Sequence, residues 1–250
     1  MSYALHAEWT KLRTLAGTWW LLLAAAFHCP PAACTLQQTG ADPAKIGFTG
    51  VFLGQVVIAL LAVLAIGGEY GTGMIRVTLT AVPRRLTAFT AKALVTAAGA
   101  LAASVLAVAG STLAGWLILP GKGLIAANGY VPLSLGNPSD LRAAGGTVLY
   151  LTLIALLAFG VTTAVRDSAA GIGLVLGILL LLPIMSAVIP DQVLSRHLEQ
   201  LAPMTAGLYI QVTEGVRQLP LTPWQGLGVT ALWAAGALIL GAAVLRLRDA

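Results

Sequence analysis

The apolar stretches of this 250-residue chain hold few side chains that could take part in chemistry. His28 is the one ionisable group well inside such a stretch. A lone histidine beside a proline pair is more typical of a packed, hydrogen-bonded group than of a proton relay. Ser104 and Ser111 have no accompanying Gly-x-Ser-Gly, paired aspartate or His-Glu-x-x-His pattern. Cys29 and Cys34, five residues apart, are poorly placed for a disulfide on a helix and lack metal-ligand spacing. We therefore expect no catalytic site, no resident cofactor and no metal site.

The composition indicates that most of the surface faces lipid. Hydrophobic residues make up 58% of the chain, charged residues 9%, and the mean hydropathy is +0.89. A soluble domain needs about a quarter charged residues. Apolar runs of spanning length predict an all-α integral membrane protein with one domain over residues 1–250 and six transmembrane helices. The expected spans are 18–33, 48–67, 93–119, 147–165, 169–189 and 227–245.

A separate helix is predicted before the first span. Apolar residues repeat at helical spacing over 3–17, and the other face is mainly polar. This pattern favours an amphipathic helix in the membrane interface, although a frayed start of the first span is an alternative. The residues that define it are Glu8, Trp9, Lys11, Leu12 and Arg13.

The basic residues set the expected orientation. Nine of the 14 Lys and Arg residues fall on one side when the spans are threaded in order, and this side includes both termini. Lys and Arg are enriched on the cytoplasmic side of membranes, so we expect both termini there. The net charge of +5 is then explained by anchoring at the membrane surface and does not call for nucleic acid.

The connection over 68–92 carries more pattern than a simple loop. Ile75, Leu79 and Val82 repeat at helical spacing, which predicts a short helix with an exposed apolar edge. Gly71 and Gly73 permit a sharp exit from the second span, Pro83 ends the element, and Arg84 and Arg85 anchor its return. The segment suits docking into a groove on a soluble partner. A simple positive-inside anchor is the alternative.

Three further features complete the pattern. The extracellular connection 190–226 contains an apolar stretch over 206–212, which predicts a short re-entrant or surface helix. Asn137 to Asp140 resemble a helix cap before the fourth span. Gly173 and Gly177 give a small-residue strip that suits close helix packing, within the chain or between two chains.

In order along the chain, these segments resemble the permease subunits of type-2 ABC transporters, in the form common among actinobacterial multidrug and antibiotic exporters. The resemblance covers nearly the whole chain. The segments that carry it are Glu8-Trp9-Thr10-Lys11-Leu12-Arg13-Thr14, Glu69-Tyr70-Gly71-Thr72-Gly73-Met74-Ile75-Arg76 with Val82-Pro83-Arg84-Arg85, Ala91-Lys92, Arg166-Asp167-Ser168-Ala169-Ala170-Gly171 and Arg246-Leu247-Arg248-Asp249-Ala250. The Gly-Thr-Gly at 71–73 and the proline pair at 30–31 depart from the family's usual pattern.

The resemblance implies a transport subunit of the plasma membrane with no ATPase site of its own. Two such permeases, expected as a homodimer, would each dock on a separate ATP-binding subunit that binds ATP and Mg²⁺. Gly121-Lys122-Gly123 lacks the other residues of a phosphate-binding loop, in keeping with this division. The resemblance assigns contact with the ATP-binding subunit to Glu69, Gly71, Thr72, Ile75, Arg76, Leu79, Pro83, Arg84, Arg85, Arg166 and Asp167.

Three functions remain open at this point. The first is ATP-driven export of a hydrophobic or amphipathic compound, such as an antibiotic, a peptide or a lipid-like molecule. The second is a membrane scaffold or assembly protein that does not transport. The third, an ion-coupled carrier or small intramembrane enzyme, is disfavoured because the spans lack the polar groups that it needs.

Overall fold

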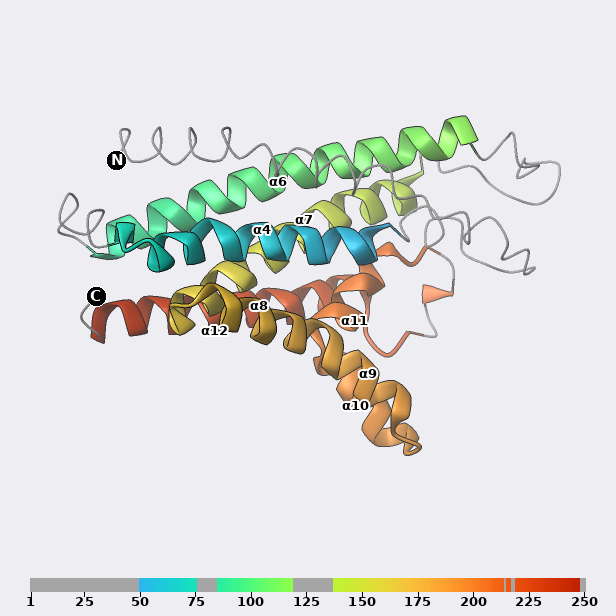
Figure 1. Ribbon diagram of the computed structural model, residues 1–250. Coiled ribbons are helices and arrows are strands. Elements are labelled where there is room, and N and C mark those ends of the chain that lie inside the picture. The colour runs from blue at the N-terminus through green and yellow to red at the C-terminus, as the bar shows by residue number, and fades with distance from the viewer. Residues whose placement is uncertain (1–49, 76–84, 119–136, 214, 217–218, 248–250) are drawn as a thin grey trace.

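The computed structural model of the chain describes residues 50–75, 85–118, 137–213, 215–216 and 219–247, and Figure 1 shows how they are arranged. Every regular element in these ranges is a helix. The elements are α4 (Val51–Gly71), α6 (Arg85–Ile118), α7 (Pro138–Val165), α8 (Ser168–Leu176), the π-helix η4 (Gly177–Leu181), α9 (Leu182–Val188), α10 (Gln192–Leu201), α11 (Pro203–Leu208), the 3-10 helix η5 (Tyr209–Gln211) and α12 (Pro223–Leu247).

Five helical segments are long and apolar enough to cross a membrane: α4, residues 85–113 of α6, α7, the continuous run α8–η4–α9, and α12. They correspond to the second to sixth expected spans, so an all-helical fold with five candidate membrane-spanning helices is confirmed in the described residues. The first expected span and the interface helix with Glu8, Trp9, Lys11, Leu12 and Arg13 lie outside those residues, as do His28, Cys29 and Cys34.

The helices are longer than the apolar runs that predicted them. α4 continues to Gly71 and α6 begins at Arg85, so both ends of the connection predicted over 68–92 are helical. α7 begins at Pro138, with Asn137 at the N-cap position, well before the predicted start of the span at residue 147. Proline suits the first helical position because its missing N–H has no helical partner there. The bounds of the predicted spans were therefore too narrow at these ends.

α7 is the central helix of the bundle. Buried residues make up 61% of its most apolar window, against 22% for α6 and α12. Tyr150, Leu151, Ile154 and Leu157 are all nearly inaccessible. α4, α6, α8 and α12 surround it (Figure 1). Most of the large apolar side chains that remain exposed lie on the outer helices, as expected where lipid is the solvent.

Close backbone approach joins α7 to α12. A Cβ built at Gly160 would lie 2.5 Å from the backbone carbon of Ala237, and one built at Gly241 would lie 2.8 Å from the Gly160 oxygen. Such distances leave no room for a side chain, so these glycines set the spacing of the two helices. α7 and α12 therefore pack as one unit over this stretch.

A π-helical turn interrupts the fifth span between α8 and α9. Gly173 of α8 and Gly177, the first residue of this turn, face open space, since a Cβ on either would meet nothing within 4 Å. The glycine strip is therefore not used for packing against the described part of the chain. Beyond the turn, α9 and α10 form an arm that leaves the bundle (Figure 1).

The segment α11–η5 is packed inside one end of the bundle, which we call the α11 end. Its Ala206 and Ile210 have no exposed surface, and a Cβ at Gly146 of α7 would overlap the Ile210 side chain. A Cβ at Gly226 of α12 would overlap the Ala206 carbonyl oxygen. The apolar stretch predicted over 206–212 as a short helix is thus largely helical, and it lies against α7 and α12.

Neutral hydrogen bonds accompany this packing at the α11 end. Tyr150 donates to the Gln55 side chain of α4, and Gln211 donates to Thr147 over 3.2 Å. Thr230 donates to the carbonyl of Pro203 over 2.9 Å. Polar side chains buried in an apolar bundle need such partners, because an unmade hydrogen bond there is costly.

Candidate functional site

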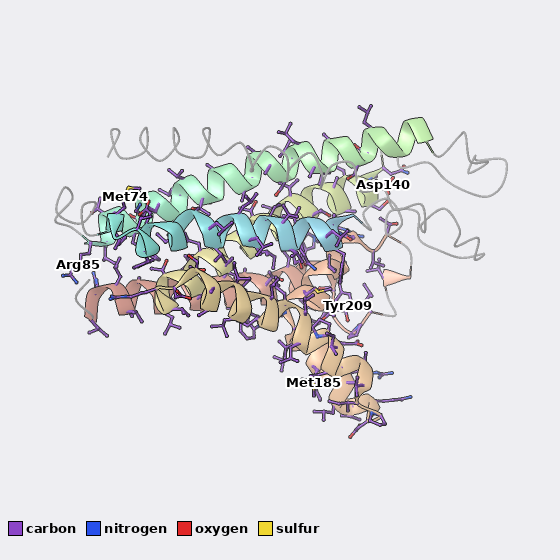
Figure 2. All side chains as sticks on the ribbon, in the orientation of Figure 1. Met74, Arg85, Asp140, Met185 and Tyr209 are labelled. Carbon is purple, nitrogen blue, oxygen red and sulfur yellow. The ribbon has the colours of Figure 1, made fainter. Side chains whose placement is uncertain are left out.

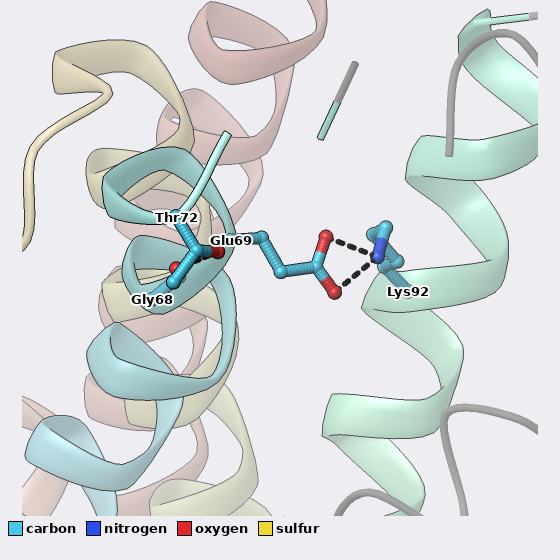
Figure 3. Close-up of polar contacts among 4 residues, drawn as sticks. All are labelled: Gly68, Glu69, Thr72 and Lys92. Atoms are coloured by element: carbon cyan, nitrogen blue, oxygen red, sulfur yellow. Dashed lines mark hydrogen bonds and ion pairs between the residues drawn. The ribbon is translucent and has the colours of Figure 1, made fainter. Parts of the chain in front are cut away.

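Glu69 and Lys92 form a buried ion pair between the end of α4 and the start of α6 (Figure 3). The ammonium nitrogen lies 2.7 Å from one carboxylate oxygen and 2.6 Å from the other. Glu69 is 5% exposed and Lys92 is 7% exposed. The pair links the end of α4 directly to α6. Each charge depends on the other, because a single buried charge without its partner would be costly.

The chain turns away from the axis of α4 directly after the helix ends at Gly71. Gly73 has a φ of 70°, the left-handed conformation that glycine adopts without strain. The Thr72 hydroxyl donates to the Gly68 carbonyl over 2.8 Å, which satisfies one of the last carbonyls of the helix (Figure 3). Of the two glycines predicted to turn the chain, Gly73 does so and Gly71 is the last helical residue.

A tight turn between α7 and α8 lies against the same end of α4. Arg166 ends α7 with a φ of 63°, and Asp167 caps α8 by accepting a hydrogen bond from the Ala170 amide over 2.7 Å. A Cβ built at Gly67 of α4 would lie 2.5 Å from the Ser168 hydroxyl oxygen. α4 and this turn are therefore in close contact.

Two arginines from different segments hold the end of α12. Arg85, the first residue of α6, donates to the Leu245 carbonyl over 3.3 Å. Arg166 donates to the Val244 carbonyl over 3.1 Å. α12 ends at Leu247, so both carbonyls belong to its last four, which have no partner within the helix. Positive side chains also suit the negative end of the helix dipole.

An apolar cluster lies between the four helices at this end. It is built on Ile66, Phe89, Phe159 and Leu245, one from each of α4, α6, α7 and α12. The rings of Phe89 and Phe159 have centroids 5.4 Å apart in a tilted arrangement, a favourable aromatic geometry. We call this region, with the Glu69–Lys92 pair and the two arginines, the ion-pair end.

The structure brings together most of the described residues that were predicted to contact a partner. Glu69, Arg85, Arg166 and Asp167 come from two separate segments of the sequence and meet at the ion-pair end. Figure 2 shows Arg85 and Met74 at this end and Asp140 at the other. Gly71 and Thr72 lie at the same helix end and are exposed.

Two predicted contact residues, Glu69 and Ile75, are buried in the structure, and Glu69 pairs with Lys92. Ile75 was expected on an exposed apolar edge, yet it is 7% exposed, whereas its neighbour Met74 is 45% exposed. The exposed apolar side chain at this point is therefore Met74. Four other predicted residues, Arg76, Leu79, Pro83 and Arg84, lie outside the described residues.

Sequence reasoning placed Lys92 only at the start of the third span and did not pair it with Glu69. A signal was present, because two opposite charges stand at the facing edges of consecutive apolar runs. The acceptors on α12 left no such signal, since any residue supplies a backbone carbonyl.

The contacts at the ion-pair end link the ends of several helices to one another. Among the described residues, no group of three or more His, Cys, Asp or Glu side chains could hold a metal ion. The charged groups at the ion-pair end contact helix ends and each other.

Compared with protein-family models and with curated proteins, the chain matches none.

Proposed function

We propose that the chain is the membrane-spanning permease subunit of an ATP-driven ABC exporter in the plasma membrane. A separate ATP-binding subunit, present in two copies with its ATP and Mg²⁺, would dock at the ion-pair end. The second permease would be a further copy of this chain. The cargo would be a hydrophobic or amphipathic compound. In keeping with this, the charged residues of the described spans away from the ion-pair end are Asp140 and Arg142, both in the first turns of α7.

One observation carries this proposal. The resemblance assigns the ATP-binding contact to two segments, around 69–85 and 166–167, that are about 80 residues apart in sequence. The described parts of both segments lie at one end of the bundle, where Gly67 and Ser168 pack together and Arg85 and Arg166 reach the same turn of α12. A single soluble partner could therefore touch both.

The basic residues support a cytoplasmic position for this end. Arg85, Arg166 and Arg246 all lie here, and positive charge near the ends of spans favours the cytoplasm. The outward-facing strip of Gly173 and Gly177 supports the pairing of two permeases, because small residues allow close approach of a second helix.

The test combines co-purification with cysteine labelling. The tagged chain, purified from native membranes, is expected to bring an ATP-binding protein with it in a one-to-one ratio. With Cys29 and Cys34 replaced by serine, Met74→Cys should react with a membrane-impermeant thiol reagent only from the cytoplasmic side. The ATP-binding subunit should protect it. Met74 is the better probe than Ile75 because it is exposed.

Gln192→Cys is the matched control. Gln192 is exposed on α10, outside the candidate spans, and should react from the opposite side with or without the ATP-binding subunit. A chain that purifies without any ATP-binding protein and moves no solute would favour a scaffold. Transport that survives ATP depletion and stops when the proton gradient collapses would favour an ion-coupled carrier. Either result would overturn the proposal.

A further inference from the structure

We propose that α12 is the helix that carries motion from the docking sites to the opposite end of the bundle, and that Arg85 and Arg166 fasten it to those sites. This inference rests on the proposed function. It adds a defined route through the molecule, with two positioning residues at its start and the α11 segment at its end.

The first step is the double attachment of the α12 terminus. The two arginine contacts join residues 160 and 78 positions apart, and the two acceptors are neighbours, Leu245 and Val244. Helix ends are commonly satisfied by local residues that follow the helix. Here the donors come from the two segments assigned to partner contact, so a displacement of either segment pulls on the same helical turn.

The second step is the conformation of Arg166. Its φ of 63° places a non-glycine residue in the left-handed region, which is unfavourable for residues that carry a Cβ. Glycine would adopt this conformation without strain, but it has no side chain to donate to Val244. The strained backbone therefore goes together with a contact that only a long donor side chain can make.

The third step is that the surroundings of the attachment move together. The Glu69–Lys92 pair fixes the end of α4 to the start of α6, and Gly67 packs on Ser168 of the α7–α8 turn. Leu245 itself belongs to the apolar cluster that the four helices share. A push on one part of the ion-pair end is therefore passed to the others as a rigid-body movement.

The fourth step is at the other end of α12. Its 25 residues span about 38 Å at 1.5 Å per residue, so the helix reaches from the ion-pair end to the α11 end. There Gly226 packs on the Ala206 carbonyl, and Trp233 donates to the Leu201 carbonyl over 2.9 Å. Displacement of α12 must therefore be transmitted to α11 and to the end of α10.

The attachment is tested on the purified permease alone, so that the result does not depend on the proposed function. Spin labels at Thr90 and Leu247, both exposed, report the separation of α6 from the end of α12. We expect a narrow distance distribution in the parent protein and a clearly broader one in Arg85→Gln/Arg166→Gln. The Lys replacements at both positions, which keep a donor, should narrow it again.

Arg142→Gln is the matched control for this measurement. Arg142 also donates to a backbone carbonyl, that of Val212 over 2.6 Å, but at the α11 end and without touching α12's terminus. It should leave the Thr90–Leu247 distribution unchanged. A distribution that stays narrow in the double Gln variant, or broadens equally in Arg142→Gln, would overturn the assigned role of the two arginines.

The route along α12 is tested in the complex with the ATP-binding subunit. Gly236 is exposed in the middle of α12, where a Cβ would meet nothing within 4 Å. Gly236→Pro should kink the helix, whereas Gly236→Ala should leave it straight. We expect Gly236→Pro to retain the subunit and its ATPase activity while cargo exported per ATP falls at least about fivefold, the lower end of usual coupling factors.

Unchanged export per ATP in Gly236→Pro would overturn the route, even if the proposed function stands. If the proline variant does not fold, the same labels at Thr90 and Leu247 are measured in the complex with and without ATP. The distance should stay constant, because both sites belong to one moving unit. A nucleotide-dependent change in that distance would contradict the inference.

Discussion

Close packing through glycine occurs at both ends of the bundle, and the ion-pair end adds charged side chains that link one helix to another. At the ion-pair end, charged side chains reach across to partners on other helices, as Glu69 does to Lys92 and Arg166 to Val244. At the α11 end, backbones approach so closely that Gly146 and Gly226 have no room for a Cβ, and most of the polar contacts are neutral.

The difference teaches where each kind of contact is useful. Long charged side chains carry their charge far from the backbone, so they reach partners on helices whose backbones stay apart. Contact through glycine has no such reach, so it fixes the spacing of two backbones. The ion-pair end is thus built to take up a displacement and pass it on, while at the α11 end the α11 segment follows α12 at a fixed spacing. Three predictions test this contrast, from the largest effect to the smallest.

The largest effect is expected from breaking the buried ion pair. Glu69→Leu or Lys92→Met alone leaves one buried charge without its partner and should destabilise the protein by about 3–5 kcal/mol. The double variant removes both charges and should recover most of this loss. Denaturation in mild detergent measures the three values, and a double variant as unstable as the sum of the singles would contradict the prediction.

A smaller loss is expected from filling a backbone contact at the α11 end. Gly226→Ala places a methyl group on the Ala206 carbonyl and should cost about 1–3 kcal/mol, because backbone cannot move aside easily. Gly228→Ala, two residues later, points into open space and should stabilise α12 by about 0.5–1 kcal/mol. Thermal unfolding of both variants checks the sign, and equal effects would refute the packing account.

The smallest effect compares two helix caps. Asp167 caps α8 at the ion-pair end, and Asp191 caps α10 on the arm by accepting from Val193 over 2.8 Å. Each change to alanine should cost about 1 kcal/mol. Under the proposed function, only Asp167→Ala should also weaken binding of the ATP-binding subunit, measured by co-purification. Asp167→Asn, which keeps the cap and removes the charge, separates the two effects.

Hydropathy predicted the spanning helices that the structure describes, together with their order. Hydropathy could not predict where these helices end, because the hydropathy averaged over a window of sequence drops as soon as the window includes a charged residue. Glu69 and Lys92 satisfy each other, so α4 and α6 continue through them to Gly71 and back to Arg85. Tertiary pairing, absent from a window of sequence, therefore decided these boundaries.

The sequence predicted many of the residues of the candidate site, but it did not predict which atoms they contact. Glu69, Arg85, Arg166 and Asp167 were singled out by a resemblance, and their meeting at one end follows from the alternation of up and down spans. The burial of Ile75 was missed because a helical stripe marks an apolar face without saying what covers it. The hydrogen bonds from Arg85 and Arg166 to α12 were missed because every residue has a backbone carbonyl, so the sequence does not mark the acceptors.

The Glu69–Lys92 pair has a consequence for how the protein is made. Both residues lie within helices that are long and apolar enough to cross a membrane. A charged side chain at the centre of a lone inserted helix costs about 2.5–3.5 kcal/mol, and less near the end of the helix. If the two helices were inserted one after the other, the buried charge of Glu69 on α4 would have no partner until α6 was inserted. Entering together as a hairpin, the two helices neutralise each other at once, so biosynthesis should favour their joint release into lipid.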